Sequence, residues 1–98
     1  MYFVFIGSSI VATDKECGGS EVEKFQGANL YPDDCAKACK GVSSMYAFCS
    51  ASISSKFCYC ETSVKTTGKC EMKSAHGCTL YQYASGSLKI SHLYDYIV

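Results

Sequence analysis

The chain contains no arginine and no tryptophan, and it has one proline and two histidines. All nine basic residues are therefore lysines, and they balance nine acidic residues to a formal net charge of zero. Arginine supplies the planar fork that pairs with phosphate and guanine, and positive charge supplies most of the affinity for nucleic acids. We therefore expect no nucleic-acid partner.

An apolar run at residues 2–12 is too short to cross a membrane as a helix, which needs about 20 residues. We therefore predict no membrane span. No lysine or arginine precedes the run, so it lacks the basic start of a typical secretory signal. Its aromatic and β-branched residues favour a strand instead. A strand that is apolar on both faces needs cover on both faces.

No set of side chains suited to catalysis stands out. His76 and His92 are isolated, and a lone histidine in a disulfide-rich chain is more often structural than a general base. The adjacent carboxylates Asp33 and Asp34 fit helix capping better than the separated carboxylates of a glycosidase. We therefore predict no enzymatic activity and no cofactor.

Cysteine, by contrast, is abundant, with eight in 98 residues. This density is typical of small domains held together by disulfides, which persist in oxidising compartments. We therefore predict a secreted or cell-surface protein. The cysteines are Cys17, Cys35, Cys39, Cys49, Cys58, Cys60, Cys70 and Cys78.

A zinc site is the alternative use of these cysteines. The spacing of Cys35 and Cys39 suits zinc ligands, but Cys58 and Cys60 are closer in sequence than a usual zinc knuckle. Spacing alone does not select one disulfide pairing. We predict that all the cysteines form disulfides and that the domain has no metal site.

Residues 32–41 carry the clearest helix signal. Two aspartates near the start can cap the first turn, and Gly41 suits the left-handed residue that follows a helix. Cys35 and Cys39 are four residues apart and project from one face. A helix this short is marginal alone, so we predict that two disulfides from that face hold it on a sheet.

The predicted partner of this helix is a β-hairpin with three cysteines. Alternation places Ala47 and Cys49 on one face of its first strand, while Cys58 and Cys60 share a face of the second. Small residues beside cysteines suit the side on which the helix lies close. We predict that both helix cysteines pair with cysteines of the hairpin.

The outer cysteines, Cys17 and Cys78, lie near the two ends of the cysteine-containing region, and we predict that they pair with each other. Patterns of apolar and β-branched residues predict the remaining strands. The predicted strands are 2–12, 46–53, 56–61, 69–72, 79–83 and 88–98.

Several short motifs resemble the core of a PAN/apple domain: Asp34-Cys35-Ala36-Lys37-Ala38-Cys39, Tyr46-Ala47-Phe48, Phe57-Cys58-Tyr59-Cys60 and Gly68-Lys69-Cys70-Glu71-Met72. The Cys-Tyr-Cys step and the closing Leu80-Tyr81-Gln82-Tyr83 are also similar to the WSC domain. The sequence departs from these patterns at Met45, where PAN/apple domains have a cysteine, and at Glu61, where WSC domains have a glycine.

The resemblance covers about residues 17–83. It implies an α+β fold, a small disulfide-rich domain in which one short helix packs on a curved antiparallel sheet. It also implies binding of an extracellular protein or glycan without catalysis. We divide the chain into two parts. Residues 1–13 are predicted to form an apolar N-terminal strand, and residues 14–98 are predicted to form the disulfide-stapled domain.

Two functional hypotheses follow. In the first, the protein is a structural subunit whose N-terminal strand, from Met1 to Val11, adds to the sheet of a neighbouring copy and builds a fibre or another homopolymer. The segment 88–98 is the predicted partner edge. The predicted assembly interface consists of Tyr2, Phe3, Val4, Phe5, Ile6, Ile10 and Val11.

In the second hypothesis, the protein is a PAN/apple-like or WSC-like module that binds a glycan or protein ligand, and residues 2–12 pack on their own domain. Tyrosine offers an aromatic face with a polar end, which suits sugar binding. The candidate ligand platform is Tyr59, Tyr81 and Tyr83. The alternative is that these tyrosines only fill the faces of the sheet.

Overall fold

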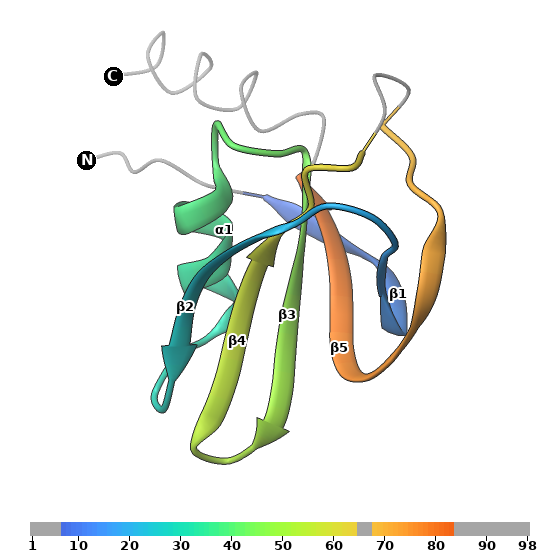
Figure 1. The fold of residues 1–98 in the computed structure, drawn as a ribbon. Helices are drawn as coiled ribbons and strands as arrows, with labels where there is room; N and C mark the ends of the chain where they lie inside the picture. The colour runs from blue at the N-terminus through green and yellow to red at the C-terminus, as the bar shows by residue number, and fades with distance from the viewer. Residues whose placement is uncertain (1–6, 65–67, 84–98) are drawn as a thin grey trace, which may run out of the picture.

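The described residues contain five strands, which form one antiparallel sheet (Figure 1). The computed structural model describes residues 7–64 and 68–83. The strand order is β1-β5-β3-β4-β2, so β1 and β2 are neighbours in sequence but lie at opposite edges. The elements are β1 (Ser8–Cys17), β2 (Val22–Gly27), α1 (Pro32–Cys39), β3 (Met45–Ser52), β4 (Ser55–Cys60) and β5 (Met72–Tyr83).

The single described helix, α1, forms where the sequence predicts it. Pro32 occupies the first turn, and the Asp34 carboxylate accepts a hydrogen bond of 2.9 Å from the backbone N–H of Tyr31. This bond satisfies a donor that the helix itself leaves unpaired. The helix ends at Cys39, and Gly41 then adopts a φ of +83°, which glycine tolerates best.

Two disulfides join α1 to β4, as the sequence predicts. They are Cys35–Cys58 and Cys39–Cys60. Cys35, Ala36 and Cys39 of the helix are buried in one cluster with Tyr46 and Phe48 of β3. The coarse expectation is therefore confirmed within residues 7–64 and 68–83: a small, disulfide-rich antiparallel sheet with one short helix.

The predicted pairing of Cys17 with Cys78 is wrong. Cys78 lies directly opposite Cys49 in the β3–β5 register, and these two cysteines form a disulfide. Cys17 ends β1 at the far end of β5, opposite Met72, and bonds to Cys70 just before that strand. The two strands run antiparallel, so the outermost cysteines in sequence lie far apart along the sheet.

The prediction of which β3 side chains face the helix is also wrong. Cys49 pairs with Phe57 and Phe48 pairs with Cys58, so Phe48 shares the α1 side with Cys58. Ala47 and Cys49 lie in the cluster on the opposite face. Side chains alternate along a strand, so a one-residue difference in the register of the turn exchanges the two faces.

Three strand predictions need correction. The sequence predicts no strand at the polar segment β2. It predicts strands at 69–72 and 79–83, whereas β5 runs without a break from Met72 to Tyr83 and residues 69–71 are not in a strand. Within β5, Gly77 departs from the extended backbone conformation with a φ of +85°. The N-terminal strand extends to Cys17 rather than to residue 12. Residues 1–6 and the predicted strand 88–98 lie outside the described residues.

Within the described ranges, no helix has the length and apolar character required to cross a membrane.

Candidate functional site

The first half of β1 presents an uncharged, exposed strand at the edge of the sheet. Among the described strands, only β5 pairs with β1. Ile10 is 60% exposed and Val11 is 37% exposed. Residues 8–13 contain no charged side chain. We call residues 8–13 the open half of β1, because an edge strand keeps one row of backbone N–H and C=O groups free to pair with another strand.

The second half of β1, residues 14–17, is protected. Asp14 has a φ of +55° at an irregularity in the register, and its carboxylate accepts a hydrogen bond of 3.0 Å from Gly77 N–H. Lys15 donates to Ser74 Oγ at 3.3 Å. Charged side chains and bulges are the usual devices that prevent a further strand from adding to an edge.

The open half belongs to the sheet of its own chain. Residues 8–12 pair with β5, with Ser8 opposite Tyr83 and Ile10 opposite Tyr81. Tyr46 also donates a hydrogen bond of 2.8 Å to Ser8 Oγ. The prediction that Met1–Val11 is a strand of a neighbour's sheet is therefore wrong for residues 8–11. The other predicted interface residues, from Tyr2 to Ile6, lie outside the described part of the chain.

An apolar pocket lies beside Val11 on the face opposite α1. Its volume is about 310 Å³. Met45 is buried within its lining, whereas Met72 is 52% exposed. Strand addition gains specificity when the added strand places a side chain in such a pocket next to the edge. The pocket is lined by Val11, Met45, Gly68, Lys69, Cys70, Met72 and Gln82.

Two of the three predicted platform tyrosines lie on the α1 side. The Tyr81 ring stacks on Tyr46 with a centroid distance of 5.1 Å. Tyr83 lies at 5.3 Å from Tyr46, and its hydroxyl donates to the carbonyl of Ala36 in α1. Burial raises the pKa of Tyr83 to about 12. Tyr81 and Tyr83 thus fill the space between the sheet and the helix.

The third predicted tyrosine, Tyr59, lies on the other face. Its ring is nearly parallel to that of Phe57, with an interplanar angle of 12° and a centroid distance of 6.3 Å. Burial, and then the nearby carboxylates of Glu23 and Glu21, raise the pKa of Tyr59. The predicted three-tyrosine platform is therefore not brought together. The spacing of Phe57 and Tyr59 on one strand indicates the pair that does form.

Glu61 was missed as a candidate functional residue. It follows β4, where a glutamate is normally solvated, yet it is 0% exposed. Its Oε2 accepts a hydrogen bond of 2.5 Å from Cys17 N–H. Burial, and then a hydrogen bond with Glu21, raise the pKa of Glu61 to about 8. Nothing local in the sequence indicates this burial, because it depends on contacts with distant residues.

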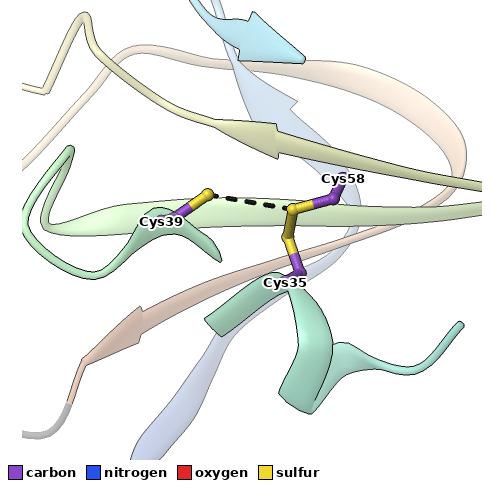
Figure 2. A group of neighbouring side chains, drawn as sticks. All are labelled: Cys35, Cys39 and Cys58. Atoms are coloured by element: carbon purple, nitrogen blue, oxygen red, sulfur yellow. Dashed lines mark hydrogen bonds between the residues drawn. A yellow bond between two sulfur atoms is a disulfide. The ribbon is translucent and has the colours of Figure 1, made fainter. Parts of the chain in front are cut away.

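Three sulfur atoms lie close together between α1 and β4, and Figure 2 shows them. Cys39 Sγ is 3.8 Å from Cys58 Sγ. Cys58 is bonded to Cys35, and Cys39 is bonded to Cys60. Metal binding requires thiolates, and a disulfide sulfur is not one. Every cysteine of the chain, including those near Glu16, is in a disulfide. Such a density of disulfides is typical of extracellular proteins.

No family model, curated protein or solved structure matches this chain. The resemblance to PAN/apple and WSC domains therefore stays a prediction.

Proposed function

We propose that this protein is a secreted, non-enzymatic structural domain that assembles with copies of itself by strand addition at the open half of β1. In this proposal, a short helix is held on a curved antiparallel sheet, and the domain works in an extracellular compartment. The observation that carries the proposal is an uncharged, exposed edge strand beside an apolar pocket.

The energetics favour pairing at this edge. An added strand hydrogen-bonds to the free side of residues 8–13 and covers Ile10 and Val11. Full burial of such a side chain contributes about 1.5–3 kcal/mol, and these two are only partly exposed. The protected residues 14–17 limit the contact to the open half. The new strand is therefore short, and an apolar side chain in the pocket adds to its affinity.

The apolar residues 2–6 are separated from β1 by Gly7 alone, and they are the proposed donor to the β1 edge of a neighbouring copy. Donation by one surface and acceptance by another is a heterologous contact. Such contacts close a ring or propagate a filament. In this proposal the two segments have different roles: residues 2–6 donate, and residues 8–13 accept.

Substitution Ile10→Lys tests the proposal, because a lysine on an edge strand opposes strand addition. Sedimentation velocity of the wild type should show assemblies, and the variant should sediment as a monomer. Ile53→Lys is the matched control, since Ile53 is 91% exposed and lies in the β3–β4 turn, away from β1. The proposal fails if Ile10→Lys assembles as well as Ile53→Lys does.

A second candidate function is glycan or protein binding on the Phe57–Tyr59 face, as the PAN/apple and WSC resemblance implies. The parallel rings and the Glu23 carboxylate near Tyr59 favour it, because sugars stack on aromatic rings and hydrogen-bond to carboxylates. Binding to a glycan array should be lost with Tyr59→Ala and kept with Tyr31→Ala, a substitution of a tyrosine that is 65% exposed elsewhere. Equal binding by both variants excludes this site.

A further inference from the structure

The segment between β1 and β2 carries the chain from one edge of the sheet to the other (Figure 1). We call residues 18–21 the crossover. Residues after β4 hold it in place: Ser63 Oγ donates to Gly18 C=O at 2.8 Å, and Ser63 N–H donates to Ser20 C=O at 3.1 Å. Gly18 N–H donates to Glu71 C=O at 2.7 Å. The crossover is thus held by residues 61–63 and by Glu71.

Glu61 lies at the start of this anchoring segment, with its side chain buried. Its Oε2 accepts from Cys17 N–H, directly before the crossover. Among the described residues, its Oε1 is shielded from solvent and has no hydrogen-bond partner, and Oε2 of Glu21 is shielded and unpaired in the same way. The Glu21 carboxyl is close enough to act on Glu61 through hydrogen bonding and through its charge. Two ionised carboxylates in this arrangement repel each other across buried, unpaired oxygens.

One proton removes this conflict. A protonated carboxyl donates to the facing carboxylate and forms a charge-assisted O–H···O hydrogen bond. Both unpaired oxygens are then satisfied, and one negative charge remains instead of two. The proton that is lost at higher pH passes to solvent and leaves the two charges facing each other.

The charges described around the two carboxyls do not offset the repulsion that the proton removes. Glu16 of β1 and Glu21 both act on Glu61 as negative charges. Lys73 of β5 is a cation near Glu61 among the described residues, but its side chain is 57% exposed and pairs with Glu16 at 3.0 Å. Glu23 of β2 faces Tyr59. The carboxyl pair therefore lies in a negative environment, which favours keeping the proton.

We propose that protonated Glu61 donates a hydrogen bond to the Glu21 carboxylate and forms a pH-dependent latch, and that deprotonation of Glu61 releases the crossover from residues 61–63. The pKa of Glu61 is raised from its ordinary 4.5 to about 8, so folding favours the protonated carboxyl. The folded state binds this proton more tightly than the open state does. The stabilisation of the folded state by this proton is therefore complete below about pH 4.5, and it is lost as the pH rises through about 8.

Carbon-13 NMR of the side-chain carboxyls and exchange of the Cys17 and Gly18 amides test this latch. Glu61 should titrate with a midpoint near 8. Protection of the two amides, corrected for intrinsic exchange, should fall by at least about tenfold between pH 6 and pH 9. In Glu61→Gln this fall should disappear, because the amide donates to Glu21 at every pH.

Glu71→Gln is the matched control, since Glu71 is an exposed carboxylate beside the crossover, and it should keep the wild-type pH profile. If Glu61→Gln does not fold, Glu21→Gln serves instead, because its amide donates to an ionised Glu61 and should lower the Glu61 midpoint. The latch is excluded if Glu61 titrates near its ordinary value. An unchanged pH profile in Glu61→Gln, or an unchanged Glu61 midpoint in Glu21→Gln, excludes it too.

Discussion

The two halves of β1 share one edge and one neighbour, and each contains an irregularity in the register, at Val11 and at Asp14. They differ in charge and in how they are held to the rest of the domain. Residues 8–13 are uncharged, and Ile10 and Val11 are exposed among them. Residues 14–17 are bulged at Asp14, carry three charged side chains and end in the Cys17–Cys70 disulfide. Under the proposal of strand addition, the open half is the part of this edge that accepts the added strand.

The largest expected effect comes from releasing the protected half. The double variant Cys17→Ala/Cys70→Ala removes a disulfide that joins residues 53 positions apart. Removal of a native disulfide from a small domain costs about 2–5 kcal/mol of unfolding free energy. Denaturant unfolding measures this loss, and amide exchange at residues 15–17 should rise.

Cys49→Ala/Cys78→Ala is the matched control for that experiment, because its disulfide joins β3 to β5 and leaves the end of β1 closed. This control variant should lower the unfolding free energy, but the amides of residues 15–17 should stay protected from hydrogen exchange. If both double variants open the end of β1 equally, the Cys17–Cys70 bond does not hold that half.

The next effect is at Gly77, which lies opposite the bulge of β1. A Cβ at this position would lie 2.7 Å from the carbonyl oxygen of Ser50, and the φ of +85° disfavours any other residue. Gly77→Ala should therefore lower the unfolding free energy by about 2–4 kcal/mol. Gly68→Ala has a similar φ of +77° with no atom within 4 Å, so it isolates the backbone cost of about 1–2 kcal/mol. Equal losses in thermal or denaturant unfolding would contradict the clash with Ser50.

The smallest effect is expected at Asp14 itself. Asp14→Ala removes the hydrogen bond to Gly77 N–H and places alanine at a φ of +55°. We expect a loss of about 1–2 kcal/mol, since the site is exposed. Asp14→Asn keeps an acceptor and tolerates the left-handed conformation, so it should stay close to the wild type. If the two variants unfold alike, the side-chain bond does not fix the bulge.

The sequence predicts the local features of this fold better than its long-range ones. The helix is predicted by its capping residues, and its disulfides to the β3–β4 hairpin are predicted by two cysteines four residues apart. Both signals involve residues that are close together in the sequence. The partner of Cys17, the face of Cys49 and the burial of Glu61 depend on strand order and register. A one-residue difference in a turn reverses those faces, and no local pattern determines it.

The same limit applies to the candidate site. The apolar character of Ile10 and Val11 is visible in the sequence, but their position on an edge strand is not. Tyr59 and Tyr81 carry the same chemistry, yet the register places Tyr81 with Tyr46 on the α1 side and Tyr59 with Phe57 on the other. Residue type thus predicts which side chains can take part in binding, and tertiary structure determines which of them meet.

Hydrogen exchange along β1, measured in dilute and in concentrated samples, tests the central claim most directly. Strand addition at the open half predicts that amides within residues 8–13 become more protected as the concentration rises, while those of residues 14–17 stay unchanged. Equal protection in both halves at every concentration, or a gain confined to residues 14–17, would contradict assembly through the open half of β1.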